Sequence, residues 1–324
     1  MSIHTHATRN DTASEVLASG TLHCGDNLAW LKSLPTGCAD LVFTSPPYVD
    51  CRTYGIGFKL TGQAWVDWAV ERYIECVRVS RGLVAWVVEG KTKRFRWDAT
   101  PALLMADLHR RGVKLRKPPI YKRDGIPGSG GPEWLKNKYE FIVCASHGRL
   151  PWSENTAMGH PPRFAPGGAL SHRHADGRRK NSYASAACQN RMGGTHSHDG
   201  RTYGPRLQRE GDVRRVPQYA PPKNANPGNI IDCGPGGGGH MGSRLAHENE
   251  APFPEKLAEF FIRSFSPPGG LVIDPHMGSG TVAAVAERHG RGWAGCDVRE
   301  SQIELARRRV EEVKASRQEA TIGA

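Results

Sequence analysis

The stretch LVIDPHMGSGT, residues 271–281, has the pattern of a buried strand, a tight glycine turn and the start of a helix. Glycine lets the backbone adopt positive φ and approach a ligand closely, and the helix N-terminus beyond it favours a carboxylate. Further along, a second apolar run ends at Asp297, whose side chain could hold two ribose hydroxyls. The spacing differs from GxGxxG, so the turn alone predicts either packing or ligand binding. An acidic residue at the next strand end favours a nucleoside site.

Short apolar runs alternate with helical patterns in residues 21–145 and again in residues 253–313. Strands that alternate with helices predict the α/β class, with a mostly parallel sheet covered by helices on both faces. The charge run at residues 307–309 is typical of the solvated face of a helix. We expect strands at 41–44, 83–88, 141–145, 271–274 and 292–297, and helices at 26–34, 64–79, 100–111, 255–265, 281–289 and 300–313.

The composition limits the class of protein and the kind of partner. The chain has 324 residues, a net charge of +12 and a sequence pI near 9.5, which favours a polyanionic partner. Its eight cysteines are scattered without a CxxC pair, so we expect a reducing cytosol and neither a disulfide framework nor a cysteine zinc site. No stretch reaches the roughly 20 apolar residues of a membrane helix, and the N-terminus lacks a secretion signal.

Residues 146–245 interrupt the alternating pattern. They carry 14 Lys or Arg against 6 Asp or Glu and seven of the 14 His, with few apolar runs. This composition fits either a disordered linker or a basic insertion that orders on DNA phosphates. We favour an insertion at 146–246 in one fold formed by 21–145 and 247–316, with a flexible N-terminus at 1–20 and a flexible tail at 317–324. The His-x-His pairs at 172–174 and 196–198, with Cys188 between them, match no zinc spacing, so we expect no metal.

The pentapeptide TSPPY, residues 44–48, directly follows an apolar run. The exocyclic amino group of a base is a weak nucleophile because its lone pair is delocalised into the ring. A serine hydroxyl and a carbonyl that precedes a proline can accept its hydrogens, and a tyrosine face can pack against a base taken out of its stack. An ordinary Pro-Pro turn is the alternative. The candidate catalytic residues are therefore Ser45, Pro46, Pro47 and Tyr48.

These motifs, in this order, resemble those of the β-group DNA amino-methyltransferases, most closely the cytosine-N4-specific members. In that family the catalytic motif precedes the donor-binding motif, with the target-recognition region between them. The resemblance covers about residues 21–145 and 247–313, through the segments 25–27, 40–48, 138–141, 249–255 and 274–281. The chain departs from the family at His276, where Phe is usual, and at Asn249-Glu250, where His-Pro is frequent.

The resemblance implies a Rossmann-like S-adenosylmethionine-dependent methyltransferase fold, an irregular basic insertion and S-adenosyl-L-methionine as cofactor. It implies that a flipped base attacks the donor's methyl group by direct displacement. Asp274 is expected to shape the glycine turn rather than touch the methyl group, and Asp26 either reaches the donor or caps a helix. The cofactor-binding candidates are Asp26, Thr44, Phe253, Asp274, Pro275, His276, Gly278, Gly280, Thr281 and Asp297. The candidate DNA contacts are Arg52, Tyr54, Arg178, Arg179, Lys180, Arg214 and Arg215.

The resemblance also narrows the reaction. No Pro-Cys dipeptide occurs, which argues against cytosine-C5 methylation through a covalent thiolate. In the family, Ser at the first position of the acceptor motif usually accompanies cytosine N4, and Asp or Asn accompanies adenine N6. We therefore expect cytosine-N4 methylation, with adenine N6 as the alternative, and with RNA or protein methylation or an inactive DNA-binding protein as distant ones.

The expected macromolecular partner is double-stranded DNA. A restriction–modification pair would add a cognate restriction endonuclease, whereas a solitary or phage-borne enzyme would have none. We expect a monomer or homodimer in the cytoplasm, encoded by a bacterium or a phage.

Overall fold

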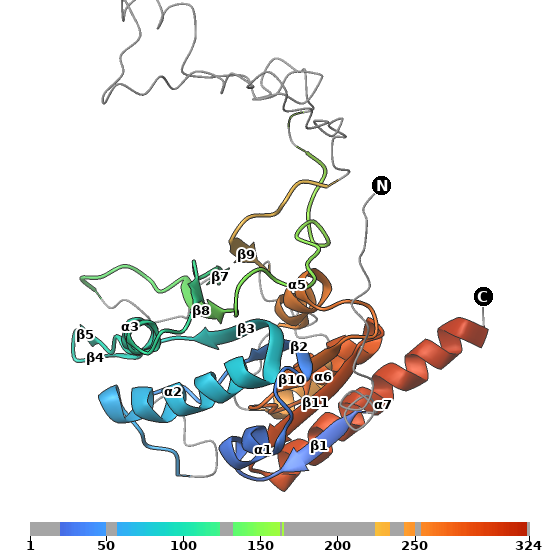
Figure 1. Ribbon diagram of the computed structural model, residues 1–324, viewed down its shortest axis with the longest axis horizontal. Coiled ribbons are helices and arrows are strands. Elements are labelled where there is room, and N and C mark those ends of the chain that lie inside the picture. Colours follow the sequence, from blue (N-terminus) through green and yellow to red (C-terminus); the bar gives the residue numbers. More distant parts are fainter. Residues whose placement is uncertain are drawn as a thin grey trace, which may run out of the picture. The chain divides into compact units, whose positions relative to one another are not determined.

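A mixed β-sheet forms the centre of the structure, a computed structural model that describes residues 20–49, 57–123, 132–162, 164, 224–233, 243–249 and 254–322 (Figure 1). β6 (Leu115–Arg116) pairs with β8 beside the main path of the sheet. Within the described residues the strands follow the order β1 (Thr21–Cys24), β11 (Gly292–Asp297), β10 (Leu271–Asp274), β2 (Ala39–Thr44), β3 (Ser80–Val88), β8 (Tyr139–Ala145), β7 (Ile120–Lys122) and β9 (Ile230–Asp232).

The strand pairing is mostly parallel. From β1 through β11, β10 and β2 to β3, each strand runs parallel to its neighbour. β8 is antiparallel to both β3 and β7, and β7 is parallel to β9. The expected α/β class with a mostly parallel sheet is therefore confirmed.

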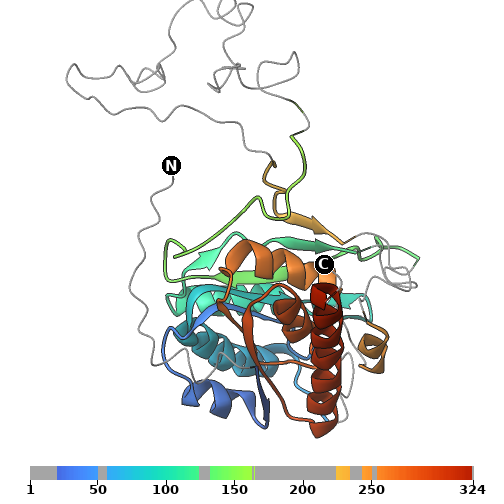
Figure 2. The same ribbon diagram turned by 90° about the vertical axis from the view of Figure 1, so that its right-hand side faces the viewer.

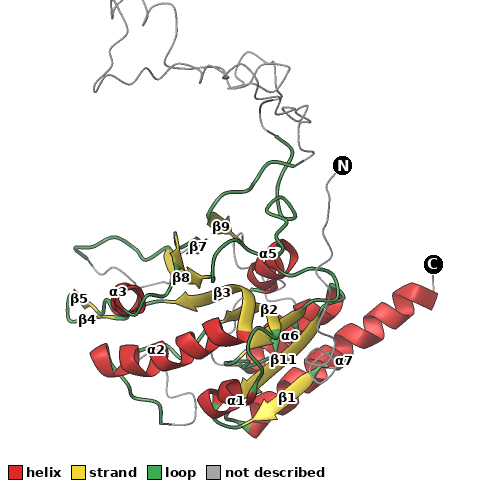
Figure 3. Cartoon of the chain, in the orientation of Figure 1, coloured by secondary structure: helices red, strands yellow, loops and turns green. Residues whose placement is uncertain are grey.

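Helices cover both faces of the sheet (Figures 2 and 3). Each face has its own apolar core. On one face lie α1 (Asn27–Ser33), α2 (Gly62–Val79) and α3 (Thr100–Arg110). On the other lie α5 (Glu255–Phe265), α6 (Thr281–Arg288) and the long α7 (Glu300–Ile322). A short 3-10 helix, η1 (Arg244–Glu248), and a hairpin of β4 (Thr92–Lys93) and β5 (Arg96–Trp97) complete the described elements.

β2 is the strand that ties the centre of the sheet together. All six of its residues are buried, as expected for a parallel strand with helices on both sides. The carboxylate of Asp40 accepts two 2.8 Å hydrogen bonds from Arg81 and one of 2.8 Å from the amide of Leu271. Its backbone lies so close to Gly82 that a Cβ there would be 1.9 Å from the Asp40 carbonyl oxygen. β10, β2 and β3 are thus held in a single register.

The structure differs from the expected domain limits in two places. α7 continues to Ile322, beyond the expected end at 313, so residues 317–322 are helical where we expected a tail. β9 lies inside the expected insertion and pairs with β7, so residues 230–232 belong to the sheet. The chain divides into two compact units, Met1–Met158 with Pro227–Ala324, and Gly159–Asn226. Among the described residues, no helix is long and apolar enough to cross a membrane.

Candidate functional site

The two turns singled out in the sequence meet at the carboxyl ends of β2 and β10. These strands are parallel neighbours, with Leu41 opposite Val272 and Val42 opposite Ile273. The chain continues from β10 to β11 on one side and from β2 to β3 on the other, so the sheet has a topological switch point between them. Open α/β sheets bind ligands at such points. Here the hydroxyl of Thr44 lies 2.5 Å from Oδ1 of Asp274.

The glycine turn after β10 is held from both ends. Gly280 is the N-cap residue of α6, with φ 73°, and a Cβ there would be 2.7 Å from the Cβ of Ala306 in α7. Gly278 has φ 49°, and its amide donates to Oδ2 of Asp297 at 3.0 Å. The other oxygen of Asp297 accepts from the amide of Arg299 at 3.0 Å. Asp297 therefore fixes the turn. Its Oδ1 also pairs with the guanidinium of Arg299 at 3.5 Å, whereas Oδ2 keeps a second lone pair for a ligand.

Two titratable side chains lie beside this turn, Asp274 fully buried and His276 partly buried. Burial raises the pKa of Asp274 to about 7, even though Thr44 and the amide of His276 donate to its Oδ1. Burial lowers the pKa of His276 to about 3, and the charge of Arg72 adds to this shift. Among the described residues, Oδ2 of Asp274 and Nε2 of His276 have no hydrogen-bond partner. Both atoms could satisfy a polar ligand that enters the site.

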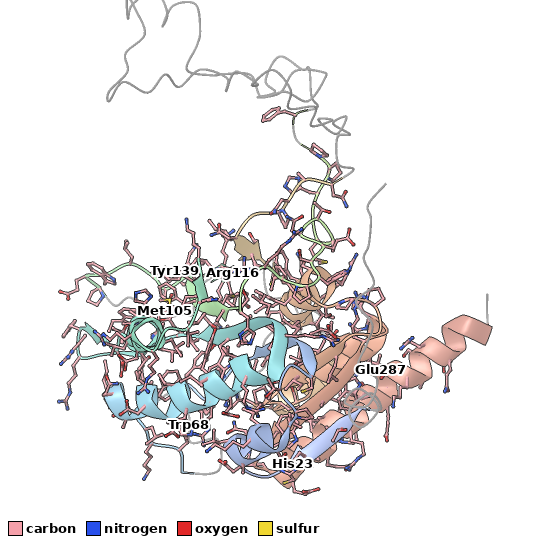
Figure 4. The ribbon with its side chains drawn as sticks, in the orientation of Figure 1. His23, Trp68, Met105, Arg116, Tyr139 and Glu287 are labelled. Carbon is pink, nitrogen blue, oxygen red and sulfur yellow. The ribbon has the colours of Figure 1, made fainter. Side chains whose placement is uncertain are left out.

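The tautomer of His276 follows from its neighbours. When Asp274 is ionised, Thr44 gives it its only hydroxyl proton. Nδ1 of His276 lies 3.2 Å from the same hydroxyl oxygen and must then be the donor, which leaves Nε2 as an acceptor. The imidazole packs against the rings of Trp68 and Trp86, with centroids 5.7 and 5.2 Å away. These two indoles make an apolar wall on the α2 side (Trp68 is labelled in Figure 4).

A polar network from α1 and α2 supports the same turn. Arg72 donates to Asn27 at 2.7 Å and to Asp26 at 3.0 Å, and it stacks on the ring of Trp68. Asn27 in turn donates to the carbonyl of Pro275 at 3.0 Å. The other carboxylate oxygen of Asp26 caps α1 through the amide of Ala29. Asp26 therefore caps a helix, which is one of the two roles expected for it.

The TSPPY turn presents Ser45 between two acceptors. Its Oγ lies 3.3 Å from the carbonyl oxygen of Val87 and 3.3 Å from the hydroxyl of Tyr48, and its one proton can go to only one of them. Tyr48 donates to Glu140 at 2.7 Å. An indole N–H, that of Trp65, donates to the carbonyl of Pro47 at 2.8 Å. The turn is thus fixed by neighbours on α2, β3 and β8.

Glu140, at the start of β8, is buried and also pairs with Arg123. The hydroxyls of Ser45 and Tyr48 therefore form a chain that leads from the end of β2 to a paired carboxylate. Because the carboxylate of Glu140 binds both the guanidinium of Arg123 and the phenol of Tyr48, it fixes the position of the tyrosine hydroxyl.

The comparison with known families follows from this geometry. The N6_N4_Mtase family model, described as DNA methylase, matches residues 39–308, which include both turns. The chain belongs to this family. It is a DNA methyltransferase of the N4/N6 group.

Two relatives span most of this methyltransferase. The orphan methyltransferase M.BamHII of Bacillus amyloliquefaciens is 28% identical over 286 residues, covering 84% of this chain and 88% of the relative. The DNA adenine methyltransferase YhdJ of Escherichia coli K12 is 24% identical over 296 residues, covering 90% and 82%.

Solved structures share the fold. The PvuII DNA methyltransferase (cytosine-N4-specific) superposes with a TM-score of 0.60 at 18% identity, covering 91% of this chain and 90% of that one. TTHA0409 of Thermus thermophilus, a putative DNA modification methylase in complex with S-adenosyl-L-methionine, gives 0.51 at 23% identity, covering 91% and 94%.

The structure brings most of the predicted site residues of the methyltransferase together at the strand ends. One of them is Thr281, whose hydroxyl oxygen accepts a 2.8 Å hydrogen bond from the buried Arg309. This bond holds the start of α6 against α7. The remaining candidates, Phe253, Arg52, Tyr54, Arg178, Arg179, Lys180, Arg214 and Arg215, lie outside the described residues, as do Cys188 and the four histidines at 172, 174, 196 and 198.

Sequence reasoning missed the residues that support the two turns. Trp65, Trp68 and Arg72 share one face of α2, and their spacing of three and four residues was the available signal. Glu140 belongs to a motif that was recognised, but without a role. Trp86 gave no signal, because an aromatic residue within a buried strand is typical of a core.

Proposed function

We propose that this methyltransferase transfers a methyl group from S-adenosyl-L-methionine to the N4 amino group of a flipped cytosine in double-stranded DNA. The observation that carries the proposal is the position of Ser45. This neutral acceptor stands at the end of β2, one residue after Thr44, whose hydroxyl contacts Asp274 of the glycine turn at 2.5 Å. The acceptor and donor turns therefore lie at the ends of neighbouring parallel strands.

The residues around the glycine turn fit a cationic donor. S-adenosyl-L-methionine supplies a methyl group on a positively charged sulfur and also carries an ammonium group. The unpartnered Oδ2 of Asp274 is buried, and a nearby positive charge would favour the ionised carboxylate. Oδ2 of Asp297 has a lone pair left for a hydroxyl group, and Trp68 and Trp86 give an apolar wall. Residues on both sides of the site thus offer what a charged nucleoside requires.

The TSPPY turn prepares the amino group for attack. The hydroxyl of Ser45 accepts one amino hydrogen, and the carbonyl of Pro46, which precedes a proline, accepts the other. The carbonyl of Pro47 is already engaged by Trp65, so it is not the second acceptor. Tyr48 packs against the flipped base, with its hydroxyl held by Glu140. Positioning and polarisation of the amino group then supply most of the rate enhancement.

The hydroxyls of Ser45 and Tyr48 offer a route for the proton that the reaction releases. The amino nitrogen forms a bond to the methyl carbon as the carbon–sulfur bond breaks, and the methylated nitrogen must then release one proton. Ser45 can accept that proton while its own proton moves to Tyr48, whose phenolic proton in turn moves to the carboxylate of Glu140. The base thereby becomes neutral again without a charged residue in contact with it.

Ser45 favours cytosine because Ser at this position accompanies cytosine N4 in the family it resembles. A neutral hydroxyl is a weaker acceptor than a carboxylate but can accept from the amino group of either base. Adenine N6 is the second candidate, since the relative YhdJ is named a DNA adenine methyltransferase. The two relatives do not decide between the bases. A cognate endonuclease would be a partner only in a restriction–modification pair, and M.BamHII is named an orphan.

Nucleoside mass spectrometry tests the proposal. DNA of varied sequence is incubated with the protein and S-adenosyl-L-methionine, digested, and analysed for methylated nucleosides. We expect N4-methylcytosine. N6-methyladenine alone would replace the base assignment, and the absence of both on all DNA would refute the proposed reaction. RNA incubated in parallel serves as the control for the nucleic-acid class.

A further inference from the structure

A short cationic hairpin follows β3, formed by residues 91–97 with the sequence KTKRFRW. We call these seven residues the cationic hairpin. They include four Lys or Arg residues and two aromatic residues, with no acidic residue among them. Arg94 and Arg96 are exposed, Phe95 is 84% exposed and Trp97 is 40% exposed. Cationic and aromatic side chains are therefore mixed on one small exposed element.

The tip of the cationic hairpin is strained. β4 and β5 pair Thr92 with Trp97 and Lys93 with Arg96, which leaves a loop of two residues. Both loop residues, Arg94 and Phe95, have positive φ, 51° and 63°. Loops of this kind normally use Asn-Gly or Gly-Gly. Strained non-glycine residues concentrate where a side chain is needed for contact. The side chain of Phe95 points into solvent and, among the described residues, makes no packing contact that would stabilise the fold. Packing therefore does not account for the strained backbone at this residue.

The base of the cationic hairpin is fixed beside the proposed acceptor turn. Trp97 donates its indole N–H to Glu89 at 3.0 Å, and the amide of Gly90 donates to the same oxygen at 2.8 Å. A Cβ on Gly90 would lie 1.8 Å from the carbonyl oxygen of Asp98, so the two ends of the hairpin touch. Glu89 comes two residues after Val87, whose carbonyl oxygen contacts Ser45.

Further contacts join the hairpin to β8. The rings of Trp97 and Phe141 are 6.4 Å apart, and Phe141 packs edge-on against Tyr139 with centroids 5.4 Å apart (Tyr139 is labelled in Figure 4). Figure 1 shows β4 and β5 at the left-hand edge of the ribbon, beyond the arrowhead of β3. With its fixed base and exposed tip, the hairpin projects from the sheet. Glu89, which holds its base, is two residues from Val87, a contact of Ser45.

We propose that the cationic hairpin binds double-stranded DNA next to the target base, with Arg94 and Arg96 on phosphates and Phe95 stacked into the duplex where the base has left it. The inference rests on the proposed function for the identity of the polyanion. Phosphates attract exposed guanidinium groups. Apolar side chains inserted between bases offset the unstacking that extrusion of a nucleotide requires. The methyltransferase unit thus contacts DNA through an element of its own.

The test compares two hairpin variants that preserve the turn. Phe95→Gly removes the aromatic ring at a position whose positive φ suits glycine, so the hairpin should fold at least as well as before. Arg94→Asn with Arg96→Gln removes the two charges with residues that tolerate the turn and the strand. Phe95→Trp is the rescue variant. Arg307→Ala, which removes an exposed charge on α7 that pairs with Glu304, is the matched charge control.

DNA affinity is measured at several salt concentrations, and extrusion of the base is followed by the fluorescence of 2-aminopurine at the target position. We expect Phe95→Gly to weaken binding by about 5- to 100-fold, with an unchanged salt slope and reduced fluorescence. Phe95→Trp should restore both. The double variant should reduce the slope of log K against log salt by about 1.8, or about 0.9 for each lost phosphate contact. Arg307→Ala should leave fluorescence unchanged.

Wild-type affinity, salt slope and fluorescence in both hairpin variants would overturn the inference. So would a change in sedimentation from dimer to monomer with DNA binding unchanged, because the hairpin would then be a contact between copies. Failure of the proposed reaction is separate, since it appears in the wild-type protein as absence of methylated nucleosides. Binding of S-adenosyl-L-methionine should be equal in all variants.

Discussion

Thr44 is the residue through which the two turns of the site meet. Its hydroxyl lies between the carboxyl of Asp274 and the imidazole of His276, at 2.5 and 3.2 Å. Burial disfavours the charged form of both groups, so the pKa of the acid rises to about 7 and that of the imidazole falls to about 3. Near neutral pH, Asp274 is the member of this trio that changes charge. A cationic donor would meet a carboxylate above pH 7 and a neutral acid below it.

Donor affinity should therefore depend on pH through Asp274. Below pH 7 the buried acid is protonated, and we expect the dissociation constant of S-adenosyl-L-methionine to increase by up to about tenfold per pH unit. Asp274→Asn keeps an acceptor for Thr44 but cannot ionise, so its weaker affinity should vary much less between pH 6 and 8. Calorimetric titration at fixed ionic strength checks this. Parallel pH profiles for the two proteins would contradict it.

The same pKa shift affects stability, with a definite sign. Between about pH 4 and 7 the folded state holds a proton on Asp274 that the unfolded state has lost, so its contribution to stability falls as pH rises. His276 contributes oppositely, because between about pH 3 and 6.5 the unfolded state binds the extra proton. The melting temperature of Asp274→Asn relative to wild type should accordingly increase from pH 5 to pH 8.

Substitutions at the TSPPY turn should distinguish polarisation of the amino group by Ser45 from packing of the flipped base against Tyr48. Ser45→Ala removes an acceptor and the first member of the hydroxyl chain, so kcat should fall by roughly 10²-fold or more while donor affinity is unchanged. Tyr48→Phe keeps the ring but breaks the contact with Glu140, whereas Tyr48→Ala removes both. We expect Tyr48→Phe to retain DNA affinity and lose turnover, and Tyr48→Ala to lose both. Single-turnover rates and DNA titrations measure these effects, and identical behaviour of the two Tyr48 variants would count against a proton route.

At the scale of elements, α7 is attached to the site through one buried cation. Arg309 is 0% exposed and donates to Glu255 of α5 at 2.6 Å, to Thr281 at 2.8 Å and to Ser279 at 3.1 Å. Glu255 also accepts from Arg288 of α6. This network joins three helices to the glycine turn. A buried ion pair that loses one partner leaves an uncompensated charge.

Glu255→Ala should therefore lower the free energy of unfolding by about 3–5 kcal/mol, since Arg309 remains charged and buried. Glu304→Ala, whose pair with Arg307 is about half exposed at both ends, should change it by no more than about 1 kcal/mol. Urea denaturation of both variants provides the comparison. Similar losses in the two would show that the Arg309 network is not buried in solution.

The sequence predicted the long elements of the fold well and the short strands and the burial of Arg309 poorly. The apolar runs of the central strands and the helical patterns of α2 and α5 are clear, and these elements were predicted within a few residues. β4 to β7 and β9 have only two or three residues each, too few for a period. The prediction of a solvated Arg307–Arg309 run was wrong for Arg309, because its partners come from α5 and the glycine turn, far away in the sequence. Burial of a charge depends on such partners and leaves no local pattern.

At the scale of the whole molecule, the sheet belongs to one compact unit, and Gly159–Asn226 forms a second one. Within the latter unit, the amide of Ala225 donates to the carbonyl of His160 at 2.8 Å, so these two residues near its ends lie side by side. The sequence predicted an insertion between two halves of one fold from charge and the loss of apolar runs. It could not place the limits, because β9 is short and follows a Pro-Gly pair.

Replacing residues 161–224 by a short Gly-Ser linker should leave the methyltransferase unit folded, because residues 160 and 225 are already neighbours. We expect donor affinity within about twofold of wild type and cooperative thermal unfolding, with loss of site-specific DNA methylation. Calorimetry and mass spectrometry of treated DNA measure these properties. Loss of the folded unit would show that the excised segment is part of its core.

The neighbouring strands β2 and β10 also impose an order on biosynthesis. β10 emerges from the ribosome about 10–50 seconds after β2, at about 5–20 residues per second. Until then β2, with its buried apolar residues, has one edge without its sheet partner. An unpaired apolar strand edge is prone to join other chains. The nascent protein should therefore depend on chaperone protection for most of its translation, and slow codons between the two halves would prolong that exposure.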